Sequence, residues 1–183
     1  EALRICSNYL PRAAADPTDD EARAKMLLAA SYAGIGFGNA GVHLPHGMSY
    51  PVSGMVRNYR PEGYRVDHPL IPHGISVILN APAVARFTGE ACPQRHLHAA
   101  GLLGANTSRA KTEDAGRILS DQITSFMERL KVPNGLRAVG YSAEDIAALV
   151  KGTLPQHRVT KLSPRPAGPE DLYRLFEDSL TAW

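Results

Sequence analysis

The sequence predicts an all-α fold, an antiparallel helical bundle that forms a single domain over residues 1–183. Several segments carry apolar residues at helical spacing, and no segment of convincing length alternates as a half-buried strand does. The helical segments are long and the turns between them are short, which is typical of an antiparallel bundle. A chain of 183 residues is long enough to bury one hydrophobic core.

The first two helices are expected on either side of a short turn. Residues 1–15 form the first helix, which ends before an Asp-Pro pair. Thr18 and Glu21 have the spacing of a capping box, with the threonine as N-cap of the second helix. That helix, residues 21–37, is apolar on all sides after Met26, a pattern typical of a helix buried inside a bundle.

The middle of the chain alternates between buried helix and loop. The next helical segment holds His46, and Pro45 suits its first turn. Residues 52–72 are rich in proline, glycine and arginine and predict a long loop. Residues 73–87 predict another buried helix, which Pro82 kinks or interrupts.

Helices continue to the end of the chain. A short one is expected over residues 93–103, followed by the clearest amphipathic pattern of the sequence over residues 115–130. A Pro-Asn-Gly turn ends that helix. Residues 142–145 form an acidic N-cap box that opens a further apolar helix, and Pro169 opens the last one.

The composition excludes several classes of function. The net charge of +2, with basic and acidic residues interleaved, gives no basis for binding nucleic acid or an anionic membrane. No apolar run reaches the ~18 residues that a membrane-spanning helix needs. Cys6 and Cys92 have no metal-binding or redox spacing, which favours a reducing compartment such as the cytoplasm. The chain starts at Glu1 directly in a helical pattern, and we therefore expect a piece of a longer protein.

The residues best suited to chemistry lie in and after a glycine-rich stretch, residues 33–54. His46 and Tyr50 share one helical face, and His73 follows later in an Ile-Pro-His-Gly turn. A neutral imidazole is a good ligand for Fe(II) or Zn(II), so His46 and His73 are the candidate metal ligands. The alternative is that each is an ordinary core histidine, since histidine is often partly buried.

Three segments carry a family resemblance: GFGNAGVHLPHGMSYPVSG, DHPLIPHGISVILNAPAV and AVGYSAEDIAALVKGTLPQHRVTKLSP. They resemble the C-terminal helical metal-binding domain of the iron-containing alcohol dehydrogenase family, whose fold is dehydroquinate synthase-like. Within that family they are most similar to the hydroxyacid-oxoacid transhydrogenase branch. Tyr50 stands where most members have a second histidine, and this departure fits that branch. The resemblance covers nearly the whole chain.

The resemblance implies a metal site of one aspartate and three histidines, in which His46 and His73 are the third and fourth ligands. The first two ligands lie in an Asp-x-x-x-His motif, and residues 1–45 contain no such spacing. The glycine-rich loop of an N-terminal nucleotide-binding domain is also absent from this chain. We therefore expect half a metal site, with Fe(II) or Zn(II) completed by an upstream segment, NAD bound mainly by the missing domain, and an inactive fragment.

The activity that the resemblance implies is metal-assisted hydride transfer through NAD, from a hydroxy acid such as 4-hydroxybutyrate to an oxo acid such as 2-oxoglutarate. Tyr50 is the candidate catalytic residue; it contacts the substrate or the nicotinamide, or it only packs. Arg57, Arg60 and Arg65 either clamp a substrate carboxylate or are solvated loop charges. The expected partners are the two small acids, the N-terminal domain and a second copy in a homo-oligomer, and in a eukaryote the expected compartment is the mitochondrial matrix.

Other polar residues are weaker candidates. His43, one turn before His46, is either a ligand or a packing residue next to the ligands. Asp67 and His68 form a possible ligand pair in the loop. Three histidines lie in polar surroundings and are expected at the surface: His96, His98 and His157.

Three alternative functions stay open on the sequence. The first is an ordinary NAD-dependent alcohol dehydrogenase of the same family. The second is a helical metal-dependent hydrolase that uses His43, His46, Asp67 and His73, although the proline after His68 prevents a regular helix there. The third is a non-catalytic helical module that docks on a nucleotide-binding domain and exposes an apolar face in isolation.

Overall fold

The computed structural model describes residues 1–183 and contains helices and no strands, which confirms the predicted all-α class. Its α-helices are α1 (Ala2–Ala15), α2 (Asp20–Ala40), α3 (Leu44–Gly54), α4 (His73–Ile78), α5 (Ala81–Thr88), α6 (Pro93–Leu102), α7 (Ala115–Arg129), α8 (Ile146–Thr153), α9 (His157–Thr160) and α10 (Pro169–Asp178). Three short 3-10 helices are η1 (Thr112–Asp114), η2 (Leu136–Val139) and η3 (Ala143–Asp145). No helix is long and apolar enough to span a bilayer.

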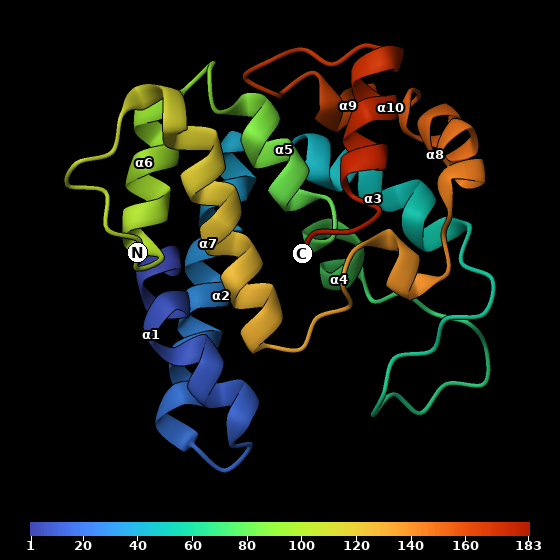
Figure 1. The fold of residues 1–183 in the computed structure, drawn as a ribbon. Coiled ribbons are helices and arrows are strands. Elements are labelled where there is room, and N and C mark those ends of the chain that lie inside the picture. The colour runs from blue at the N-terminus through green and yellow to red at the C-terminus, as the bar shows by residue number, and fades with distance from the viewer.

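The helices form two groups. Figure 1 shows α1 and α2 side by side at one end of the molecule, and α8, α9 and α10 gathered around α3 at the other. Between the groups, α7 packs on both α5 and α6. The chain between α3 and α4 forms a long loop that protrudes from the helices. The two sides of this loop are joined where the Leu70 N–H donates to the Tyr59 carbonyl at 2.9 Å.

The main core is a cluster of 18 buried residues around α3. Leu44, Met48 and Val52 lie on one face of α3 and are fully buried there. Phe176 of α10 is buried in the same cluster. Tyr141, which lies between η2 and η3, donates its hydroxyl to the Val52 carbonyl at 2.6 Å and so joins the C-terminal part of the chain to α3.

The capping box predicted at the start of α2 is wrong. The N-cap is Asp19, whose carboxylate accepts the Ala22 N–H at 3.0 Å. Thr18 instead donates its own N–H and hydroxyl to the Asp16 carboxylate. Arg12 of α1 pairs with Asp19 at 2.9 Å and with Glu21 at 2.8 Å, so the turn is held by an ion-pair network.

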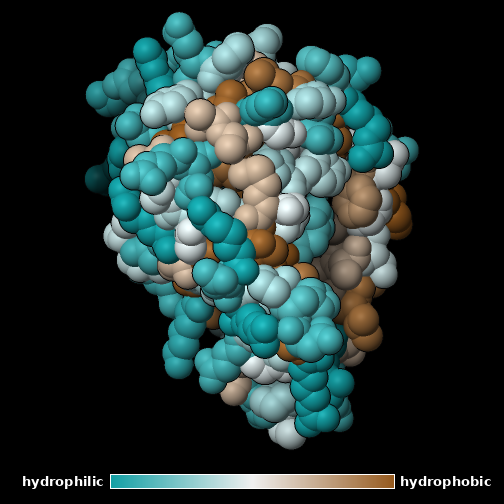
Figure 2. All heavy atoms as spheres, turned by 90° about the vertical axis from the view of Figure 1, so that its right-hand side faces the viewer, coloured by the Kyte–Doolittle hydropathy of each residue, from teal (hydrophilic) through white to brown (hydrophobic).

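The predicted burial of α2 is also wrong in this chain. The helix packs on α1 through Ala22 and Ala29, its only buried residues. Leu27, Ile35 and Phe37 are 74%, 64% and 56% exposed, because no other element of the chain covers them. Figure 2 shows hydrophobic side chains at the surface along the right-hand edge of that view.

Two boundaries in the middle of the chain differ from those predicted. Helix α3 continues to Gly54, so the predicted loop begins at Met55 instead of at residue 52. The predicted helix over residues 73–87 is two helices, α4 and α5, which meet at Leu79 and Asn80. Pro82 lies in the first turn of α5, where a missing N–H costs nothing. Of its two predicted effects, the interruption is therefore confirmed, and the kink does not occur.

Candidate metal centre

The two candidate ligands come together from separate helices. His46 lies in the first turn of α3, and His73 is the first residue of α4. Because α3 packs on α4, the two rings face each other with their centroids 5.3 Å apart and their planes at 60°. Two imidazoles on one zinc ion each place a nitrogen about 2.1 Å from it, and the observed separation is compatible with a shared metal.

The surroundings of His46 favour its neutral ring. Desolvation lowers the pKa of His46, and the nearby His73 lowers it further. Desolvation likewise lowers the pKa of His43, with smaller contributions from His46 and His96. A neutral imidazole is the form that binds a metal ion, so the lowered pKa of His46 favours the state that ligation requires.

The chain contributes fewer ligands than a metal ion needs. No group of three or more His, Cys, Asp or Glu side chains lies close enough together to hold a metal. A catalytic zinc site uses three protein ligands and an open position. His46 and His73 therefore fit only part of such a site.

Tyr50 lies one turn beyond His46 on α3 and has a partner that the sequence did not indicate. Arg158 of α9 donates a guanidinium N–H to the Tyr50 hydroxyl oxygen at 3.3 Å. The hydroxyl accepts this hydrogen bond, so its own proton remains free to be donated. Because 108 positions separate the two residues, only the packing of α9 on α3 brings them together.

The three loop arginines do not form one cluster of free charges. Arg57 pairs with the Asp145 carboxylate at 2.7 Å and donates to the Gly140 carbonyl at 3.3 Å. Arg60 donates to the backbone carbonyl of Asp67 at 2.9 Å. Arg65 is exposed. Two of the three thus hold the loop in place.

The remaining candidates do not join the histidine pair. Asp67 and His68 contact each other at 2.9 Å on the exposed loop, and the hydrogen bond from His68 lowers the pKa of Asp67. Since no three such side chains cluster, the hydrolase site built from His43, His46, Asp67 and His73 is wrong for this chain. His43 is the N-cap of α3, and its buried Nδ1 has no hydrogen-bond partner.

One surface prediction is wrong and two are consistent with the structure. His96 is buried, with 8% of its surface exposed, because it lies on the face of α6 that also buries Ala100. Its Nε2 lies 2.9 Å from the Thr88 hydroxyl of α5. His98 and His157 are exposed, as predicted.

The comparisons with known proteins agree with this geometry. Residues 1–180 match the model of the Fe-containing alcohol dehydrogenase family, C-terminal, and the chain belongs to this family as its C-terminal helical part. In fold, it is similar to a crystal structure of 1,3-propanediol oxidoreductase, with a TM-score of 0.85 and 25% identity over 97% of this chain and 43% of that one. An alcohol dehydrogenase from Oenococcus oeni gives the same four values.

Curated relatives with high sequence identity to this chain belong to one branch of the family. The chain is 61% identical over 179 residues to the mitochondrial hydroxyacid-oxoacid transhydrogenase of Xenopus laevis, covering 98% of this chain and 39% of that protein. It is 59% identical to the Homo sapiens protein of the same name, covering 98% and 38%. The chain thus spans about two fifths of the length of the relatives that it matches, and the predicted resemblance to this family and branch is confirmed.

Proposed function

We propose that this chain is the helical metal-binding half of an oxidoreductase that transfers hydride between a hydroxy acid and an oxo acid through NAD. The observation that carries the proposal is the pairing of His46 and His73 in a chain so similar to the transhydrogenases. The substrates we favour are 4-hydroxybutyrate as the donor and 2-oxoglutarate as the acceptor.

In this proposal His46 and His73 hold the metal together with ligands from a preceding segment. A donor set of two imidazoles suits both Fe(II) and Zn(II). The metal supplies a Lewis acid for the substrate oxygen when it is bound. NAD is bound mainly by an N-terminal nucleotide-binding domain, since this chain has no glycine-rich phosphate loop.

Tyr50 and Arg158 position the substrate beside the histidines. The Tyr50 hydroxyl accepts from Arg158 and can donate its proton to an oxygen of the substrate. Arg158 is exposed, and only one of its guanidinium nitrogens contacts Tyr50, so N–H groups remain for a substrate carboxylate. Both reacting acids carry such a carboxylate. Arg158 therefore replaces the loop arginines as our preferred carboxylate contact.

The same proposal explains the exposed face of α2. Residues 1–183 form one helical domain, and the N-terminal domain or the segment that joins it covers Leu27, Ile35 and Phe37 in the complete protein. Burying these side chains removes a large apolar patch from water. A second copy of the protein is the other possible cover, in a homo-oligomer. The name of the curated relatives includes "mitochondrial", and we propose the mitochondrial matrix for a eukaryotic source.

The test is metal content and hydride exchange in the full-length protein. We expect it to bind metal and to convert 4-hydroxybutyrate and 2-oxoglutarate together without added NAD. His46→Ala should lower metal content and activity together, whereas His98→Ala, on exposed His98, should change neither. Retention of stoichiometric metal by His46→Ala would refute the assigned ligand. Turnover that requires added NAD in amounts equal to the product would instead support an ordinary dehydrogenase.

A further inference from the structure

A cysteine-histidine pair lies outside the metal centre, where α5 meets α6. Cys92 is the N-cap of α6, and His96 lies one turn further along that helix. The Cys92 Sγ is 3.4 Å from the His96 Nδ1, within the range of a hydrogen bond to sulfur. Neither residue belongs to a group that could hold a metal ion. The function proposed above makes no use of this pair.

The surrounding hydrogen bonds define where the protons are. The Thr88 hydroxyl donates its only proton to the Val84 carbonyl at 2.8 Å. Its oxygen must therefore accept from His96, whose Nε2 lies 2.9 Å away and carries a proton. The His96 Nδ1 lies 3.1 Å from the Cys92 carbonyl, which can only accept. Both ring nitrogens thus face acceptors, an arrangement that suits a doubly protonated imidazolium.

The thiol of Cys92 is the proton source nearest to this ring. Transfer of its proton to Nδ1 produces a thiolate beside an imidazolium whose two N–H groups are both satisfied. The thiolate also lies at the N-terminus of α6, a helix of 10 residues, where the backbone N–H groups favour negative charge. Besides the His96 Nδ1, the un-ionised thiol has one weak contact, 3.8 Å to the Thr88 carbonyl.

The pair can be reached by a small molecule. Cys92 is partly exposed and lines a pocket of about 540 Å³ together with Thr88, Arg95, His96 and His43. Arg95 is exposed and adds positive charge in the first turn of α6. His43, whose buried Nδ1 has no hydrogen-bond partner, is a further residue that lines this pocket.

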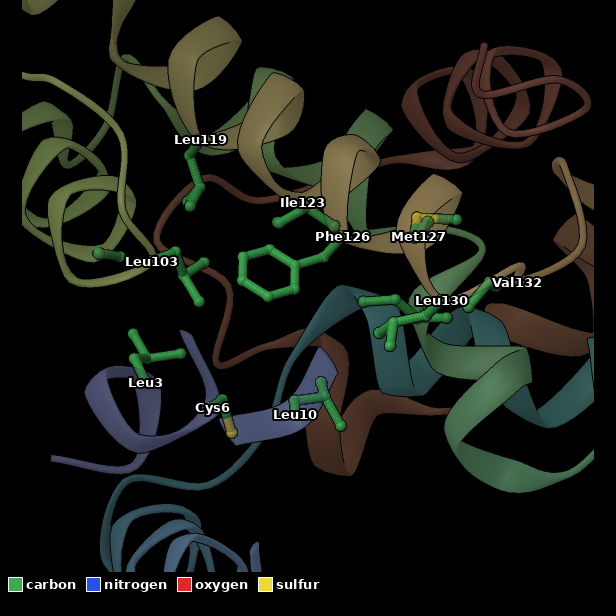
Figure 3. A pocket seen from close by; sticks show the side chains of 12 residues that line it. Leu3, Cys6, Leu10, Leu103, Leu119, Ile123, Phe126, Met127, Leu130 and Val132 are labelled. Carbon is green, nitrogen blue, oxygen red and sulfur yellow. The ribbon is translucent and has the colours of Figure 1, made fainter. Parts of the chain in front are cut away.

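The other cysteine of the chain has the opposite surroundings. Cys6 lies on α1 and lines a wholly hydrophobic pocket of about 370 Å³. Figure 3 shows Cys6, Leu3 and Leu10 on one side of this pocket and Phe126 of α7 on the other. Burial raises the pKa of the Cys6 thiol, and no base lies beside it. Cys6 is therefore an internal control for a thiol without activation.

We propose that Cys92 is a reactive thiol, activated by His96, that is oxidised by hydroperoxides. The Cys92 sulfur attacks one oxygen of hydrogen peroxide, so that an S–O bond forms while the O–O bond breaks. The departing hydroxide takes a proton from His96 and leaves as water, and His96 becomes neutral. Sulfur loses the two electrons that the peroxide gains, and the product is a sulfenic acid.

The experiment treats the full-length protein with hydrogen peroxide at pH 7, traps sulfenic acid with a cyclic dione and measures each cysteine peptide by mass spectrometry. We expect Cys92 to be labelled about tenfold faster than Cys6 or more, as for a thiolate compared with a thiol. His96→Asn should remove that difference, and the matched variant His98→Asn on the same helix should retain it. Equal labelling of both cysteines in the parent protein, or an unchanged rate at Cys92 in His96→Asn, overturns the proposal.

Cys6 also reports whether a variant remains folded, because opening the protein exposes it to the reagent. If His96→Asn speeds the labelling of Cys6, a second pair of variants decides. Thr88→Ser keeps the hydroxyl that accepts from Nε2, and Thr88→Val removes it. We expect Thr88→Val to slow labelling of Cys92 several-fold relative to Thr88→Ser. Equal rates in these two variants would refute activation through His96.

Discussion

Gly116→Ala tests whether α5 and α7 cross as closely as the structure shows. A Cβ at residue 116 would lie 2.8 Å from the Arg86 carbonyl oxygen and 2.9 Å from the Ala85 carbonyl oxygen. At the C-terminal end of α5, a Cβ at the C-cap residue Gly89 would lie 2.5 Å from the Gly116 Cα. These neighbours are backbone atoms, which cannot rotate away, so α5 and α7 would have to move apart.

The size of the effect follows from two opposing terms. Overpacking of a tight contact costs about 1–3 kcal/mol, and the rigidity of the backbone neighbours places Gly116→Ala in the upper part of that range. Alanine regains about 1 kcal/mol through its better helix propensity. We therefore expect a net loss of about 1–2 kcal/mol in the free energy of unfolding, measured by urea denaturation with circular dichroism.

Gly36→Ala in α2 is the matched control, because a Cβ there would meet nothing within 4 Å. In the 183-residue chain it should gain about 0.5–1 kcal/mol from helix propensity alone. If Gly116→Ala were as stable as the parent chain while Gly36→Ala gained stability, the close crossing of α5 and α7 would be refuted.

Two further substitutions test how the C-terminal helices attach to α3. Asp145→Asn should cost about 0.5–2 kcal/mol at pH 7, because Asp145 caps η3 and pairs with Arg57. Desolvation raises the pKa of Asp145, but the Ser142 N–H and Arg57 outweigh it and the net pKa is lowered. The folded state therefore holds this proton more weakly than the unfolded state. The stabilisation by Asp145 is complete at neutral pH and is lost as pH falls through the lowered pKa. A difference in unfolding free energy between the parent and Asp145→Asn that stays constant down to pH 2 would contradict this. Tyr141→Phe removes the buried hydrogen bond to Val52 and should cost about 1–2 kcal/mol of unfolding free energy, measured by urea denaturation. Tyr173→Phe, at an exposed tyrosine, is the control and should change stability little. Equal effects of the two substitutions would contradict the hydrogen bond assigned to Tyr141.

Most of the helices could be predicted from local signals. Two examples are the amphipathic pattern of α7 and the acidic capping box before α8. Each depends only on residues close together in the sequence, and both occur where they were expected. The Thr18 box failed because a second acceptor, Asp19, stands one residue nearer to the helix and is held there by Arg12. Spacing alone cannot rank two adjacent caps when a residue from another helix decides between them.

The candidate site was only partly predictable. The pairing of His46 and His73 was expected, although the roles of both as ligands stay a prediction, as does the role of Tyr50. Arg158 was missed because no local pattern connects it with α3. His96 was missed although a signal existed: it lies four residues before Ala100, so the two share the buried face of α6.

The wrong prediction for α2 and the small number of ligands in the proposed metal site have a common physical interpretation. Apolar residues on every side of a helix indicate that all of its sides are buried in the complete fold. In this chain, other elements pack only on the side of α2 that carries Ala22 and Ala29. In the same way, if His46 and His73 bind a metal ion as proposed, they need further ligands, and no third His, Cys, Asp or Glu lies close enough to serve. If one preceding segment both covers α2 and brings those ligands, metal binding and the stability of the domain interface must rise together. Metal should then stabilise the full-length protein against unfolding and leave the 183-residue chain unchanged.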